Sequence, residues 1–258
     1  MQAARLSSAY GWAWLIQGWA LFKRQPMTML FWSLMTSLLI NLSYLIPIIG
    51  QMALIIATPV IGFLALNACA HIERNQPVQL SMWLQPLKSA EVKKAMFKLG
   101  LCYFLVCLAA GFIAVMPFSE SLMVAMSSEE ATPEQVMRAV QAPMYLFGLF
   151  YVGISILFWH APALMGWHGI PLKKALFYSM VACWRTKGAL FIFGVCWAAI
   201  YFGAQFLASA MVSAFGASFA YFLLTPLNLL MMAYLYSCFY PIYRSVFGQS
   251  AANANATA

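Results

Sequence analysis

The sequence predicts an all-α protein, a polytopic bundle of transmembrane helices. Of its 258 residues, 64% are hydrophobic and only 8% are charged, whereas a typical soluble domain is about half apolar and about a quarter charged. Fourteen Lys and Arg residues with six Glu and no Asp cannot cover a water-soluble surface. Six apolar stretches have about the 20 residues that a helix needs to cross a bilayer. These observations exclude a soluble enzyme, a disordered chain and a secreted disulfide scaffold.

The six predicted spans make up a single integral membrane domain over residues 1–247. They cover residues 27–46, 51–70, 99–118, 143–165, 189–212 and 219–243. The first two spans are joined only by Pro47-Ile48-Ile49-Gly50, a turn sequence that fits a tight transmembrane hairpin. Residues 248–258 are small and polar, and we expect them to form a disordered cytoplasmic tail.

Orientation follows from the basic residues, because loops rich in Lys and Arg stay in the cytoplasm. With the N-terminus inside, all 14 basic residues except Arg138 lie on the inner side. Arg138 lies in an outer polar loop over residues 119–142, which also carries Glu120, Glu129, Glu130 and Glu134. We therefore expect a multi-pass protein of a bacterial inner (plasma) membrane, with both termini in the cytoplasm.

Three shorter segments mix aromatic, aliphatic and basic residues at roughly helical spacing, and each precedes one pair of spans. They cover residues 8–25, 80–98 and 171–187. Such a composition is typical of an amphipathic helix in the headgroup plane. The chain then divides into three units of interfacial helix, outward span and inward span, and each inward span contains a proline: Pro59, Pro162 and Pro226. Because any six-span chain can divide this way by chance, the threefold repeat is an open hypothesis.

Polar side chains within the predicted spans are few. None is Asp, Glu, Lys or Arg, which disfavours transport coupled to ions or protons. His160 has no partner carboxylate at its depth, and we interpret it as a structural histidine. Amides in lipid usually join helices, but they could line a substrate cavity, for which Asn228 near Pro226 is best placed. The four amides to consider are Asn41, Asn67, Gln205 and Asn228.

Motifs for catalysis and cofactor binding are missing from the sequence: it has no P-loop, no G-x-S-x-G and no H-E-x-x-H. His71, His160 and His168 lack the spacing of a haem or metal site. We therefore predict no catalytic, cofactor-binding or metal-binding residues and no enzymatic activity. Convergence of Glu73, Glu91 and His71 on one pocket would argue for an enzyme.

Two features bear on partners. The fifth span has small residues four apart, Ala204/Ala208 and Ala210/Ala214, which let helices approach closely. This spacing fits packing within the chain or contact with a second copy. The basic segments attract anionic lipid, through general anchoring or a dedicated site. We expect membrane lipids, and a protein partner or homo-oligomer, but no nucleic acid.

Short motifs spread over nearly the whole chain carry a family resemblance. They include LFKRQP at 21–26, IPIIG at 46–50, FWHAPAL at 158–164 and YPIYRSVFG at 240–248. Together they resemble a β-proteobacterial family of small six-span inner-membrane proteins of unassigned function. More distantly, the pattern is similar to the membrane domains attached to some glycerophosphodiester phosphodiesterases. The resemblance implies location and fold, but no activity and no site residues.

Two functions fit these observations. We expect a non-catalytic accessory or scaffold protein that binds protein partners or anionic lipid through its cytoplasmic face. The alternative is a permease or lipid-handling protein with a cavity between the proline-kinked spans. A polar cavity at mid-membrane would favour the alternative.

Overall fold

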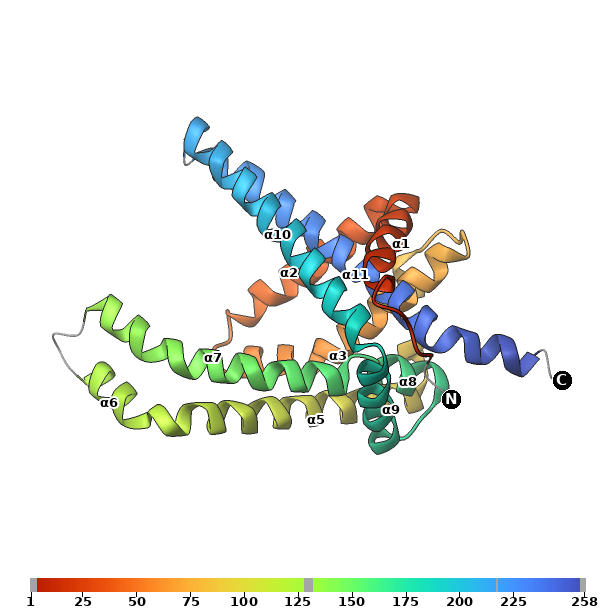
Figure 1. The fold of residues 1–258 in the computed structure, drawn as a ribbon, viewed down its shortest axis with the longest axis horizontal. Coiled ribbons are helices and arrows are strands. Elements are labelled where there is room, and N and C mark those ends of the chain that lie inside the picture. The colour runs from red at the N-terminus through yellow and green to blue at the C-terminus, as the bar shows by residue number, and fades with distance from the viewer. Residues whose placement is uncertain (1–3, 128–131, 217, 256–258) are drawn as a thin grey trace.

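The protein is mostly helical over the residues that its computed structural model describes, 4–127, 132–216 and 218–255 (Figure 1). No strand occurs in these ranges, so the predicted all-α class is confirmed. Glu129, Glu130 and residues 256–258 lie outside them. The helices are α1 (Tyr10–Arg24), α2 (Pro26–Ser43), α3 (Ile49–Glu73), α4 (Leu80–Trp83), η1 (Gln85–Lys88), α5 (Ala90–Val115), η2 (Met116–Phe118), α6 (Ser119–Ser127), α7 (Pro133–Phe158), α8 (Ala161–His168), α9 (Leu172–Arg185), α10 (Lys187–Phe215) and α11 (Ser218–Asn255).

Six helical stretches are long and apolar enough to cross a membrane, as predicted. They cover Pro26–Ser43, Ile49–Glu73, Ala90–Ala125, Glu134–His168, Lys187–Phe215 and Phe222–Gly248. The third and fourth reach well into the expected loop at 119–142. There α6 follows η2 directly, and a capping box between Thr132 and Gln135 starts α7 early. The last helix also differs from expectation, because α11 extends to Asn255, past the expected start of a disordered tail.

The spans form three hairpins, α2 with α3, α5 with α7, and α10 with α11. In Figure 1 the hairpin tips lie on one side of the molecule, which we call the tip end. The helices α1, α4, α8 and α9 lie on the other side, which we call the basic end. Thirteen basic residues lie on these helices, on the segments that join them, or on the ends of the spans next to them: Arg5, Lys23, Arg24, Arg74, Lys88, Lys93, Lys94, Lys98, Lys173, Lys174, Arg185, Lys187 and Arg244.

Two of the three expected interfacial helices form as separate helices, namely α1 and α9. The prediction of a single helix over 80–98 is wrong. That segment contains the short helix α4, the 3-10 turn η1 and the first turns of α5. Pro86 lies at the start of η1, and Ser89 caps α5 by accepting a hydrogen bond from Val92 N. A proline inside a helix and a serine at its N-cap both favour a new start, so three of the lysines join α5.

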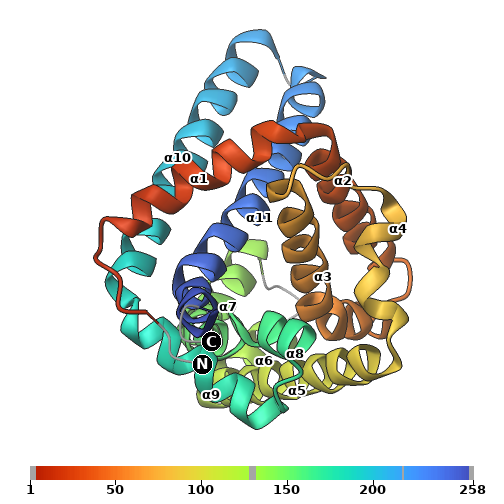
Figure 2. The same ribbon diagram turned by 90° about the vertical axis from the view of Figure 1, so that its right-hand side faces the viewer.

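The shorter segments surround the basic end, as Figure 2 shows for α1, α4 and α9. Helix α1 packs across α10 and α11, α4 packs on α3, and α9 packs on α7 and α8. Each short segment therefore packs on the hairpin of the preceding unit. For α1, which belongs to the first unit, this is the hairpin of the third unit. Glycines permit the closest of these contacts: a Cβ added at Gly18 would lie 2.8 Å from Cys238 Cα in α11.

Candidate functional site

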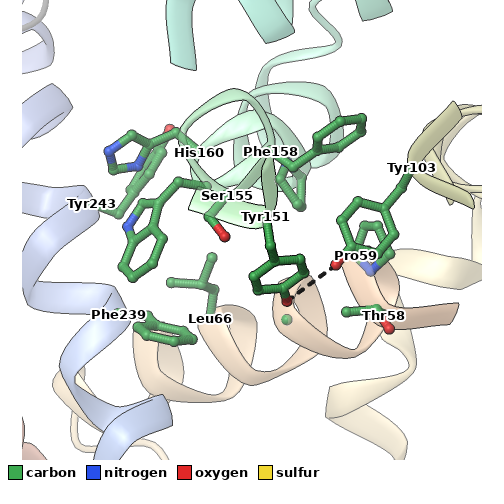
Figure 3. A pocket seen from close by; sticks show the side chains of 13 residues that line it. Thr58, Pro59, Leu66, Tyr103, Tyr151, Ser155, Phe158, His160, Phe239 and Tyr243 are labelled. Atoms are coloured by element: carbon green, nitrogen blue, oxygen red, sulfur yellow. Dashed lines mark hydrogen bonds between the residues drawn. The ribbon is translucent and has the colours of Figure 1, made fainter. Parts of the chain in front are cut away.

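A cavity of about 190 Å³ lies where α3, α5, α7, α8 and α11 meet (Figure 3). We call it the central cavity, because it takes residues from the second helix of each hairpin. Two of the three prolines expected to kink the inward spans, Pro59 and Pro162, lie in its wall, and Pro226 does not. The wall consists of Thr58, Pro59, Gly62, Leu66, Tyr103, Tyr151, Ser155, Phe158, Trp159, His160, Pro162, Phe239 and Tyr243.

Hydroxyl groups form one polar wall of the central cavity. The Tyr103 hydroxyl donates a hydrogen bond of 3.3 Å to the Tyr151 hydroxyl, which Figure 3 marks with a dashed line. Ser155 follows Tyr151 by one turn of α7, so both lie on one face of the helix. The thirteen wall residues include no Asp, Glu, Lys or Arg. The cavity can therefore hydrogen-bond a neutral ligand, but it has no charged side chain to balance an ionic one.

A break between α7 and α8 shapes the upper wall of the cavity. Pro162 lies in the first turn of α8 and has no N–H to continue the helix. The hydroxyl of Ser179 in α9 bridges the break: it accepts from His160 N at 3.0 Å and donates to Ile156 O at 3.0 Å. One buried serine thus satisfies both of these backbone groups at the break.

His160 lies at this break and is 1% exposed. Its ring packs edge-on against Phe247, with centroids 5.2 Å apart, and near Tyr243. Its Nε2 has no hydrogen-bond partner among the described residues. His168 also meets Tyr243, through a bond of 2.8 Å between its Nε2 and the tyrosine hydroxyl. Two histidines that the sequence separates by eight residues thus contact one tyrosine, but no group of three potential metal ligands occurs among the described residues.

The four amides singled out in the sequence lie away from the central cavity. Asn41 donates to Ser37 O of its own helix at 2.8 Å. Asn67 donates to Met82 O in α4 at 3.3 Å. Gln205 donates to Asn228 Oδ1 at 2.8 Å, which joins α10 to α11. Asn41 and Asn67 thus bond to backbone oxygens, and Gln205 and Asn228 join two helices. Of the four amides and His160, only His160 lines the central cavity.

Sequence reasoning missed the hydroxyls that matter most to this site. Tyr103, Tyr151 and Ser179 were not among the candidate residues, because tyrosine and serine are common residue types in helical membrane proteins. The spacing of four between Tyr151 and Ser155 was a usable sign of a shared helix face. Nothing local in the sequence could pair Tyr103 with Tyr151, which lie 48 residues apart.

Polar groups at the basic end have separate roles. The carboxylate of Glu73 forms an ion pair with Arg244, and Arg24 donates to Glu73 O at 3.0 Å. His71 Nδ1 lies 2.6 Å from Gln76 Oε1, and Glu91 lines a different cavity. The convergence that would argue for an enzyme therefore does not occur among these residues.

Cys183 of α9 lies in the interior of the basic end and is 3% exposed. Burial raises the pKa of its thiol to about 12, because the protein interior disfavours the thiolate. The thiol therefore stays protonated at neutral pH. All six cysteines of the chain are free.

Comparison with known proteins finds a relative that matches nearly the whole chain. The chain is 31% identical over 266 aligned residues to probable inner membrane protein BTH_II0599 of Burkholderia thailandensis, and the alignment covers 96% of this chain and 94% of the relative. No family model matches the chain. No solved structure matches it either. The distant similarity to phosphodiesterase membrane domains thus stays a prediction. Near full-length similarity and six apolar helices identify a multi-pass inner-membrane protein, and the chain belongs to the family of BTH_II0599.

Proposed function

We propose that this protein is a non-catalytic, lipid-handling membrane protein that holds part of a neutral amphiphile in the central cavity. The observation that carries the proposal is the cavity itself, an apolar space with one wall of hydroxyls between the second helices of all three hairpins. The lipid-handling function is the alternative that the sequence left open, and a cavity beside Pro59 and Pro162 is the feature that favours it.

The chemistry of the wall defines the ligand class. Pro59, Leu66, Phe158 and Phe239 offer apolar contact, and Tyr151 can donate its hydroxyl proton onward, because it accepts from Tyr103. A neutral lipid with ester oxygens, such as a diacylglycerol, fits this pattern. The volume is below the roughly 300–1,000 Å³ of a typical small-molecule site, so only a segment of the lipid enters and the rest stays in the bilayer.

Photolabelling tests the proposal. The full chain in lipid discs is irradiated with a diacylglycerol analogue that carries a diazirine near its ester groups, and labelled peptides are identified by mass spectrometry. We expect label on α3, α7 and α11. Tyr151→Phe should reduce labelling about 2- to 10-fold, the value of one hydrogen bond. Tyr145→Phe, on an exposed tyrosine of the same helix, is the matched control.

Two results would overturn the proposal. One is label spread evenly over the exposed faces of α2 and α10. The other is equal labelling of the Tyr151→Phe and Tyr145→Phe variants, because the hydroxyl wall would then have no part in binding.

The accessory or scaffold function is a second candidate, and the basic end favours it. Lys93 and Lys94 have no carboxylate partner within the described chain and are exposed, so they are available to a partner or to anionic lipid. Here we propose that the basic end and both termini face the cytoplasm.

Native mass spectrometry in lipid discs separates the two functions. A stoichiometric protein partner supports the scaffold, whereas retained neutral lipid without a protein supports the lipid-handling function.

A further inference from the structure

Two adjoining hollows run along the outer face of α5, away from the central cavity. The first, about 590 Å³, lies at the basic end between the first turns of α5 and the link from α8 to α9. The second, about 420 Å³, continues along α5. Both are lined by Lys98 and Leu172, so they form one groove, which we call the α5 groove.

The first hollow carries charged side chains with a positive balance. Lys94 and Lys98 lie one turn apart on the same face of α5 and both line it, together with Glu91. No ion pair joins Glu91 to either lysine, and two lysines against one carboxylate leave a net positive wall. Lys173 and Lys174 follow Leu172 at the start of α9 and are exposed, which adds to the positive potential near the opening.

The second hollow is apolar and lies along one stripe of α5. Its wall runs from Lys98 to Ala109, a rise of 11 residue steps or about 16 Å of helix. Half of a hydrocarbon core of about 30 Å is nearly the same length. The second hollow is therefore about as long as one leaflet is thick, and it begins at Lys98. Its other wall residues are Leu101, Cys102, Leu105, Val106 and Leu172.

We propose that the α5 groove binds one anionic phospholipid of the leaflet at the basic end, with the phosphate between Lys94 and Lys98 and an acyl chain along Leu101–Ala109. Charge complementarity at one end and a leaflet-long apolar stripe at the other select this occupant over a soluble anion. The site is independent of the central cavity, and its ligand carries a negative charge that the central cavity has no side chain to balance.

Matched charge variants test the headgroup end. The full chain in phosphatidylcholine discs is titrated with phosphatidylglycerol, and bound lipid is counted by native mass spectrometry. Lys94→Gln with Lys98→Gln should weaken binding about 10- to 30-fold. Lys93→Gln with Lys23→Gln, both on exposed lysines that line neither hollow, removes the same charge and should weaken binding by less than about threefold. Equal losses in both pairs would overturn the site, because attraction would then be diffuse.

A second variant tests the acyl-chain end. Ala109 is exposed and lines the apolar hollow, so Ala109→Phe should fill it without disturbing the core. We expect weaker retention of phosphatidylglycerol and unchanged binding of soluble glycerol phosphate. If glycerol phosphate or inorganic phosphate binds as tightly as the lipid, and Ala109→Phe has no effect, the groove is a general anion site and the proposal fails. A co-purified protein that displaces the lipid would overturn it as well.

The two proposals fail separately. The Lys94→Gln, Lys98→Gln variant should keep full labelling of α3, α7 and α11 by the diacylglycerol analogue. If the wild-type chain shows no such labelling, the central-cavity function is overturned, whereas the proposal for the α5 groove is unaffected.

Discussion

The basic end and the tip end of this molecule are built differently. In α10 the buried residues are Ala189, Phe193 and Ala208, whereas Phe206 is 74% exposed. In α11 the largest fully buried side chains, Ile242 and Val246, lie in the second half of the helix, and Phe222 near the tip is 81% exposed. Side-chain packing is therefore dense where the shorter helices surround the bundle and sparse along the hairpin tips.

The difference shows how lipid changes the rules of packing. An apolar side chain in a bilayer gains little by facing protein instead of lipid tails, so the hairpin tips need no common core. At the basic end the chain meets headgroups and water, and there burial of apolar surface stabilises the fold. The comparison predicts that equal substitutions have unequal effects at the two ends.

The largest expected effect comes from glycines. Gly18→Val places a side chain against the backbone of Cys238, and neither α1 nor α11 can move without losing buried contacts. Overpacking of this kind costs about 1–3 kcal/mol or more, which lowers the melting temperature by roughly 5–10 °C in a chain of this size. Thermal unfolding in detergent, followed by Trp fluorescence, measures it.

Gly203→Val is the control at the tip end, because a Cβ there meets nothing within 4 Å. Its melting temperature should match wild type within about 1–2 °C. A drop as large as that of Gly18→Val would contradict the contrast between the two ends.

Ser179→Ala is expected to have the second largest effect. It removes the hydroxyl that pairs both His160 N and Ile156 O at the break between α7 and α8. Leaving buried backbone groups unpaired costs about 1–3 kcal/mol, to be measured by the same thermal unfolding. Ser121→Ala, where an exposed serine bonds only to Phe118 O, should be nearly neutral. Neutrality of Ser179→Ala would show that the break is satisfied in another way.

A smaller effect is expected for the amide pair at the tip end. Gln205→Leu and Asn228→Leu each remove the hydrogen bond from Gln205 to Asn228, one of two by which Asn228 of α11 accepts from α10, and hydrogen bonds between helices in bilayers average about 0.6 kcal/mol. A double-mutant cycle on unfolding free energies should give a coupling of that size. Coupling near zero would mean that the two amides do not join the helices in the membrane. A coupling energy above about 2 kcal/mol would mean that helix contacts at the tip end stabilise the fold as much as those at the packed basic end.

The smallest effect is expected for the ion pair of Glu73 and Arg244 at the basic end. Both side chains are partly exposed, and exposed pairs contribute about 0–1 kcal/mol and weaken with salt. Glu73→Gln should lower unfolding free energy by no more than that, with the difference vanishing in about 1 M salt. A larger, salt-insensitive loss would show that this pair, and not apolar packing, stabilises the basic end.

Much of the fold was predictable, because its signals are local. Apolar stretches of sufficient length set the six spans, and the aromatic and basic composition of residues 8–25 and 171–187 predicted α1 and α9. The segment at 80–98 was mispredicted as one helix, since its apolar and basic pattern outweighed Pro86 and Ser89. These two residues show that turn and cap chemistry can divide a segment whose periodicity is continuous.

The central cavity was predictable only in outline. Pro59 and Pro162 indicated a cavity between kinked helices, but the polar groups that line it were sought among amides. Asn41, Asn67, Gln205 and Asn228 were instead bonded within or between helices, as membrane amides usually are. The pairing of Tyr103 with Tyr151 depends on how the hairpins meet, which no local pattern records.

The sequence by itself determined that this is a six-span membrane protein with its basic residues gathered at one end, because bilayer thickness and the cost of buried charge act on each segment alone. Tertiary structure decided where α1, α4 and α9 rest, which hydroxyls face the central cavity, and that Lys98 and Leu172 join two hollows into one groove. These features arise from contacts between segments far apart in the chain, and such contacts follow from the shapes of packed helices.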